Sequence, residues 1–171
     1  RHSIFLNKKG LNVTGADLSK ESITLAQAHQ SPTLRFIVHD MRHTINDEQY
    51  DCIFNLFTSF GYFDSFEENS KVLSAAGQML KSHGLMVIDF MNTTKVVRNL
   101  VKSESKSIAG ITFDISKKTD KGQIIKDIKF TDKNHNYHYQ EKVAALYKED
   151  FEKYFQATGF ELISLFGNYN L

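Results

Sequence analysis

Two aspartates stand at the ends of two short β-prone runs near the start of the chain. Asp17 closes the run 13–16, and Asp40 follows the run 34–38. In open α/β sheets the carboxyl ends of the strands form the edge that binds ligands, so both acids would line one cleft. One carboxylate could accept both hydroxyls of a ribose, while Asp40 could accept an exocyclic amine with Met41 against the base. The pair predicts a nucleoside site better than it predicts two unrelated helix caps.

The elements that would position these acids alternate between strand and helix. Hydrophobic periodicity and turn residues predict the order, from an initial helix end at residues 1–9 capped at Gly10. Strands are expected at 13–17, 34–38, 50–55 and 85–90, and helices at 22–29 and from Phe66 to a stop at Gly84. Strands separated by single helices pair in parallel through right-handed crossovers. We therefore predict an α/β class, a doubly wound and mainly parallel sheet, in one domain over residues 1–171.

The pattern of apolar and polar residues changes after a predicted helix at 94–101. Three runs alternate apolar and polar residues, at 108–116, 123–130 and 137–145, separated by turn residues at 120–122 and 132–134. Such alternation with short turns predicts hairpins. We expect a three-stranded antiparallel insertion within residues 105–146. A helix at 148–157 and a strand at 161–166 should follow it.

The segment 10–19, Gly-Leu-Asn-Val-Thr-Gly-Ala-Asp-Leu-Ser, resembles the one that follows the Gly-x-Gly loop of class I S-adenosylmethionine-dependent methyltransferases of the small-molecule type. Segments 36–41, 50–55 and 80–89 resemble later landmarks of that family in the right order. The resemblance implies S-adenosyl-L-methionine as cofactor, with Asp17 at its ribose and Asp40 at its adenine amine. Leu18 and Met41 would flank the adenine. It also implies that the first strand and the glycine loop are missing, and that Arg1 meets the cofactor carboxylate.

The segment from Asn55 to Tyr62 lies where this family's loop passes the methyl group. A sulfonium cation favours aromatic faces and oxygen acceptors, so Asn55 and Phe57 are expected to touch the cofactor and Tyr62 to lie nearer the acceptor. Methyl transfer is an in-line displacement that depends on alignment and exclusion of water. If the acceptor must lose a proton, the candidates are His2, His138 and Tyr147.

Composition limits the class of protein. The 21 basic and 20 acidic residues nearly cancel, and the hydrophobic share is 41% with no stretch long enough to cross a bilayer. With Cys52 as its only cysteine and no signal peptide, we expect a soluble cytoplasmic protein. The histidines 29, 39 and 43 share no metal-ligand spacing with Cys52, so no metal is assigned. Residues 95–133 carry ten basic against five acidic side chains, which is typical of a solvated face.

Four functions remain in competition on the sequence. The leading one is an enzyme that moves a methyl group from S-adenosylmethionine to a small molecule, with the insertion as a wall over the acceptor. A non-catalytic nucleoside-binding or interaction module could have the same fold. An NAD-dependent oxidoreductase would also place an acid at the second strand, but it has no need of Asp40. Nucleic-acid methylation ranks lower, because no aromatic-interleaved basic motif is present; the oligomeric state stays open.

Overall fold

The first quarter of the chain is a parallel pair of strands with helices beside it. The computed structural model describes residues 1–45 and 48–169. Its first elements are α1 (His2–Lys8), β1 (Val13–Asp17), α2 (Lys20–Ala26), the 3-10 helix η1 (Gln27–His29) and β2 (Leu34–Val38). The Ser19 hydroxyl starts α2 by accepting a hydrogen bond from the Ser22 amide at 3.1 Å. β1 and β2 pair in parallel with Asp17 opposite Val38, so the predicted elements and their direction are confirmed.

A second parallel pair follows. It consists of β3 (Tyr50–Asn55) and β4 (Leu80–Ile88), joined by helix α3 (Phe66–Met79). Gly84 does not end this helix, so that prediction was wrong: Leu80 is already extended, and Gly84 lies inside β4. The register of β4 on β3 jumps from Leu80 to Leu85, and a Cβ at Gly84 would come 2.9 Å from the Lys81 carbonyl oxygen. The glycine therefore serves a tight bend within the strand.

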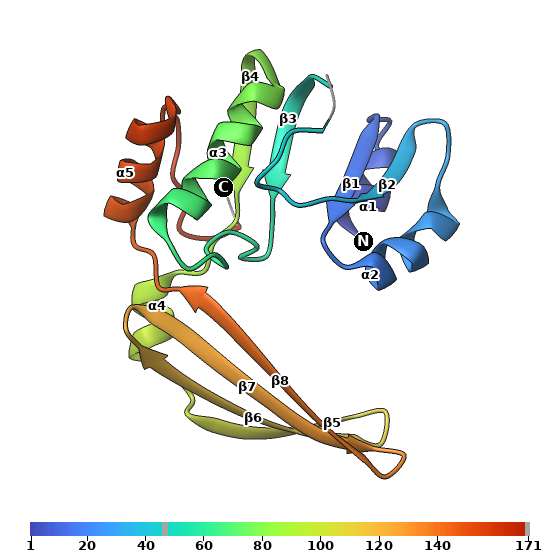
Figure 1. Ribbon diagram of the computed structural model, residues 1–171, viewed down its shortest axis with the longest axis vertical. Helices are drawn as coiled ribbons and strands as arrows, with labels where there is room; N and C mark the ends of the chain where they lie inside the picture. Colours follow the sequence, from blue (N-terminus) through green and yellow to red (C-terminus); the bar gives the residue numbers. More distant parts are fainter. Residues whose placement is uncertain (46–47, 170–171) are drawn as a thin grey trace.

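The two pairs do not join into one sheet among the described residues. β1 pairs only with β2, and β3 only with β4. Figure 1 shows β1 and β3 as the neighbouring strands of the two pairs, separated by a gap without a strand. The α/β class and parallel pairing are confirmed, whereas a continuous doubly wound sheet is not seen.

An antiparallel arm leaves the body just beyond the carboxyl ends of β3 and β4 (Figure 1). After α4 (Thr93–Arg98) come its strands β5 (Ser103–Ile108), β6 (Ile111–Asp120), β7 (Gln123–Asp132) and β8 (His135–Ala144). The arm has four strands, so the prediction of a three-stranded insertion was wrong. The predicted run 108–116 spans a turn at Ala109 and Gly110, which both have positive φ and reverse the chain. The predicted turns near Lys121 and Lys133 are confirmed.

The chain ends in helix α5 (Lys148–Thr158), which a left-handed Gly159 terminates as its C-cap. The strand predicted at 161–166 is absent: the segment is irregular and exposes Ile163 and Leu165. Alternation alone gives no strand where the backbone finds no strand partner, and none of the described strands pairs with this segment. α5 packs against α3 through a core of Phe60, Val72, Leu73 and Tyr154. This core supports the loop after β3.

Candidate functional site

Asp17 ends β1 with an exposed carboxylate. Its Oδ1 accepts a hydrogen bond from the Ser19 amide at 2.8 Å, and within residues 1–45 and 48–169 its Oδ2 receives none. Leu18 beside it is 70% exposed. Asp17 and Leu18, predicted to contact the ribose and the adenine, are thus exposed at the carboxyl end of β1. One oxygen of Asp17 accepts no hydrogen bond from the described residues.

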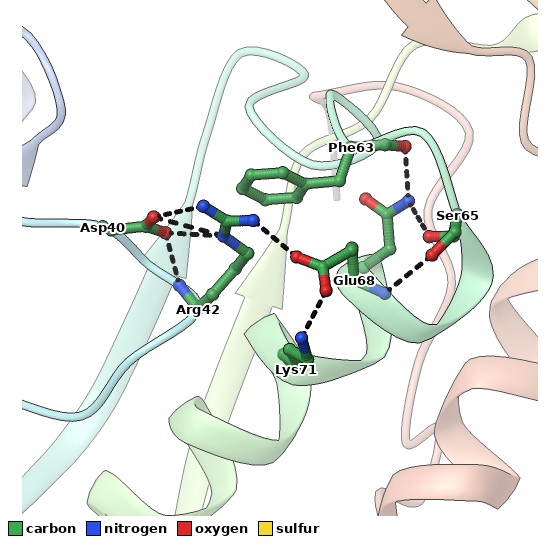
Figure 2. Close-up of polar contacts among 7 residues, drawn as sticks. Asp40, Arg42, Phe63, Ser65, Glu68 and Lys71 are labelled. Atoms are coloured by element: carbon green, nitrogen blue, oxygen red, sulfur yellow. Dashed lines mark hydrogen bonds and ion pairs between the residues drawn. The ribbon is translucent and has the colours of Figure 1, made fainter.

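Asp40 lies at the same edge, two residues beyond Val38, the partner of Asp17 in the parallel register. Figure 2 shows its carboxylate held by Arg42. The Arg42 amide donates to Oδ1 at 3.0 Å, Nε lies 3.1 Å from both oxygens, and Nη2 donates to Oδ2 at 2.6 Å. These hydrogen bonds lower the pKa of Asp40 to about 2. The three N–H groups make four hydrogen bonds to the two oxygens, which is about the number of lone-pair sites that a carboxylate offers, so Arg42 holds the carboxylate on both oxygens.

Arg42 was missed by the sequence analysis, although it follows Asp40 by two residues. Its Nη1 donates to Glu68 Oε2 at 2.5 Å, near the start of α3, and its Cζ lies 4.4 Å from the centre of the Phe63 ring. Glu68 also pairs with Lys71 (Figure 2). These contacts raise the pKa of Arg42, first through Asp40 and then through Glu68. One guanidinium therefore joins the loop after β2 to α3 and to the loop after β3.

Asn55 ends β3 and turns toward Met41. Its Nδ2 lies 3.5 Å from the Met41 sulfur. Its Oδ1 is buried and has no hydrogen-bond partner among the residues that the structure describes. A buried, unpaired amide oxygen carries a free-energy cost that a ligand donor would relieve. The structure thus brings together Asn55 and Met41, two of the predicted cofactor neighbours.

The loop after β3 runs to Ser65, and its first part, residues 56–62, is anchored at its start by Asp89, which the sequence analysis did not single out. Phe57 and Thr58 both have positive φ. Their amides donate to Asp89, Phe57 to Oδ2 at 3.0 Å and Thr58 to the carbonyl at 2.9 Å. Asp89 follows β4 as Asp17 ends β1 and Asp40 follows β2, and that shared position was the available signal. Two positive-φ residues in succession are strained, which is typical of functional loops.

The Phe57 ring is 61% exposed and meets the first residues of the chain. The Arg1 guanidinium carbon lies 5.3 Å from its centre, and the His2 ring centre 4.8 Å. Arg1 and Phe57, both predicted to contact cofactor, are therefore neighbours across the two strand pairs. Cation–π contacts of this kind hold the N-terminal end of α1 over the loop.

The far end of the same loop touches the root of the arm. The Ala144 amide of β8 donates to the Gly61 carbonyl at 2.8 Å, and a Cβ at Gly61 would lie 3.4 Å from Val143. Tyr62 is half-exposed there, and burial, with a smaller effect of Glu141, raises its pKa. Tyr62 thus lies between the loop and the arm.

The other candidates for proton transfer lie on separate elements. His2 of α1 lies beside Phe57, and Tyr147 stands at the start of α5, next to Leu146. His138 pairs with Asp127 on the exposed arm, 2.8 Å between Nε2 and Oδ1. Among the described residues no group of His, Cys, Asp and Glu could hold a metal ion, and no helix is long and apolar enough to span a membrane.

A wide hollow of about 2090 Å³ opens beside β4, α1, α5 and the segment 159–169. It exposes apolar side chains, including Phe5, Phe54, Leu85 and Val87. Its volume is about twice that of the largest usual ligand pockets, which hold roughly 300–1,000 Å³. The hollow has the size and lining of an unfilled packing layer, and the polar groups that could orient a nucleoside lie at the strand ends instead.

Comparison with known proteins agrees with this geometry. Residues 1–84 match the family model described as a methyltransferase domain. A putative methyltransferase of Geobacillus is 30% identical over 97 residues, which is 55% of this chain and 39% of that protein. The chain thus spans about two fifths of the length of this curated relative.

Two solved structures share the fold at low identity. A S-adenosylmethionine-dependent methyltransferase from Clostridium acetobutylicum superposes with a TM-score of 0.72 at 18% identity, over 86% of this chain and 63% of that one. The sugar N-methyltransferase KedS8 from Streptoalloteichus gives 0.67 at 17% identity, over 85% of this chain and 62% of that one.

Proposed function

We propose that the chain belongs to the class I S-adenosylmethionine-dependent methyltransferases and takes part in transferring a methyl group from S-adenosylmethionine to a small-molecule acceptor, which the match of residues 1–84 to a methyltransferase domain supports. The observation that carries the proposal is the pair of aspartates at one strand edge, with one Asp17 oxygen that accepts no hydrogen bond from the described residues, beside the unpaired oxygen of Asn55.

Each residue has a task in this proposal. Asp17 accepts the ribose hydroxyls, and Asp40 accepts the adenine amine beside its contacts with Arg42, while Leu18 and Met41 lie against the base. Asn55 and Phe57 face the methionine end, with Arg1 near its carboxylate. S-adenosylmethionine supplies an electrophilic methyl group. The chain's own contribution is to hold the two reactants in line and to keep water out.

The acceptor is proposed to lie between the loop 56–62 and the root of the arm, where Tyr62 is half-exposed. A small-molecule acceptor is supported by KedS8, whose name gives a sugar as acceptor and which shares the fold. Tyr62 would contact the acceptor directly. Tyr147 is the second candidate for receiving a proton. Cytoplasmic residence is part of the same proposal, because the only cysteine is the half-buried Cys52.

We also infer that residues 1–171 form one domain, with the arm at 105–146, and that a further parallel strand and glycine loop complete it between β1 and β3. The facing edges of these strands have no described partner, and Arg35 of β2 already reaches over Thr14 to Tyr50 of β3. Unpaired strand edges beside an apolar hollow are costly. The full-length protein should therefore unfold in a single transition at higher temperature than residues 1–171 alone.

Calorimetry on the full-length protein tests the cofactor. S-adenosylmethionine and S-adenosylhomocysteine should both bind, and NAD should not. Asp17→Ala should weaken S-adenosylhomocysteine binding about 10-fold or more, because two hydroxyls lose their acceptor. Asp51→Ala, an exposed acid paired with Lys81 at 2.9 Å, is the matched control. Binding of NAD alone would contradict the proposed function, and unchanged affinity in Asp17→Ala would remove that residue from the site.

Release of homocysteine in a coupled assay, screened over sugars, amines and hydroxylated small molecules, tests the acceptor class. Tyr62→Phe should raise the apparent KM for the acceptor while leaving S-adenosylhomocysteine affinity unchanged. Turnover on nucleic acid and on none of the small molecules would overturn the acceptor assignment.

A further inference from the structure

Three segments that are far apart in sequence meet at one side chain near the strand edge. Arg42 contacts Asp40 after β2, Glu68 in α3 and the ring of Phe63 in the loop after β3 (Figure 2). Its side chain is 31% exposed, Asp40 is 21% exposed and Glu68 32%. All three are shielded enough from water for their geometry to be held by these contacts.

The network continues from α3 into the loop. Ser65 caps α3 by accepting from the Glu68 amide at 3.1 Å. The buried Asn69 donates to the carbonyls of Phe63 and Ser65 at 2.9 and 2.8 Å. Phe63 and Glu68, the two outer contacts of Arg42, are therefore themselves fixed. A guanidinium held on both sides is a rigid frame for a third group.

Resting on the proposed function, we propose that Arg42 is a positioning residue of the nucleoside site: it pins the Asp40 carboxylate toward the base and links it to the loop that faces the acceptor. One side of the planar guanidinium donates to Asp40, and the other side donates to Glu68. A lysine at this position would keep the positive charge but could not make both sets of hydrogen bonds in this geometry.

This role differs from a purely structural one in its dependence on pH. The charged groups around Asp40 are Arg42 and His43, with Glu68 and Lys71 reached through Arg42. Arg42 keeps Asp40 ionised far below neutral pH. Without Arg42 the pKa of Asp40 should rise to its ordinary range, near 4, so that the carboxylate becomes protonated in mild acid.

The test is calorimetric titration of S-adenosylhomocysteine into the full-length protein between pH 3.5 and 8, because an Asp40 with a pKa near 4 is still largely ionised at pH 4.5. Arg42→Gln should bind about 10-fold more weakly than the native protein at pH 7, the size of one charge-assisted hydrogen bond. The ratio of the native affinity to the Arg42→Gln affinity should grow further below about pH 4.5. Arg42→Lys should lose affinity at pH 7 and keep the native pH profile. Asp40→Asn should be weaker than the native protein by the same factor at every pH, since it has no group to titrate.

Arg35→Gln is the matched control, because Arg35 also joins two segments through an ion pair, with Glu48, and has no contact with Asp40 among its hydrogen bonds. It should lower the melting temperature without changing affinity or pH profile. Arg42→Gln with native affinity, or with lowered affinity and the native pH profile down to pH 3.5, would overturn the positioning role. Failure of the native protein to bind S-adenosylhomocysteine would instead overturn the proposed function. Far-UV circular dichroism at each pH ensures that only folded variants are compared.

Discussion

The body of the molecule, meaning all elements outside the arm, and the arm itself both contain paired strands. The strands pair in parallel in the body and antiparallel in the arm. In the body each parallel pair is closed by a crossover, and the two pairs leave neighbouring edges unpaired. In the arm each strand pairs with the next one through a two-residue turn, and the register is continuous from β5 to β8. Parallel strands depend on distant segments, whereas hairpins depend on adjacent ones. The body therefore draws its stability from side-chain packing and the arm from local pairing.

The largest expected effect is on the core of the body. Leu73→Ala in α3 removes a side chain that is fully buried against Phe60 and Tyr154, and it should destabilise the protein by ~3–5 kcal/mol. Leu25→Ala, at a leucine that is 77% exposed, is the control and should change little. Urea unfolding followed by circular dichroism measures both. Equal losses would mean that packing does not dominate the body.

The junction between body and arm comes next. Gly61→Ala places a side chain at φ +87° and should cost ~1–2 kcal/mol. The new Cβ also touches Val143 and Leu146, so homocysteine release should fall as the loop shifts against the arm root. Gly110→Ala at the arm tip has similar strain, φ +82°, with open space around it. That variant should lose stability alone. Loss of activity in both would contradict a specific coupling at Gly61.

A smaller effect is expected in the arm. Phe130 stacks on Tyr137 with ring centres 4.8 Å apart and meets Phe113 at the same distance. Phe130→Ala should cost ~1 kcal/mol, as cross-strand aromatic pairs do. Ile108→Ala, on the edge strand and 63% exposed, serves as comparison. Amide hydrogen exchange should become faster in β6 to β8 and stay unchanged in α3. Loss of protection throughout the body would show that the stability of the arm is not independent of that of the body.

The smallest effect is on acid stability. The pKa of Asp40 is lowered to about 2 by Arg42, so this carboxylate stabilises the folded state above its unfolded pKa of about 4. The contribution is lost as the pH falls from there through the folded value. Asp40→Asn should therefore lower the melting temperature near pH 7, where the contribution is fully present, and flatten its decline between about pH 4 and pH 2. A decline identical to that of the native protein would show that other acids carry it.

Local signals predicted much of the fold. Ser19 before a helical run, and glycine or asparagine between alternating runs, act over a few residues, and the elements they mark are present. The helix end predicted at Gly84 and the strand predicted at 161–166 were wrong for one reason. Whether a segment bends or pairs as a strand depends on neighbouring segments that are distant in the sequence. The run 108–116 failed for a different reason, since Ala109-Gly110 is a turn within an otherwise alternating pattern.

The sequence by itself determined the order of strand and helix as far as α4, the acids Asp17 and Asp40 at two strand ends, and the family they indicate. Spacing along the chain carries that information, because hydrophobic periodicity and turn chemistry are local. Only the tertiary structure decided that Arg42 holds Asp40, that Asn55 turns its amide to Met41, and that Gly61 touches the root of the arm. These contacts depend on the direction of side chains from separate segments, and direction in space is fixed only once those segments have packed.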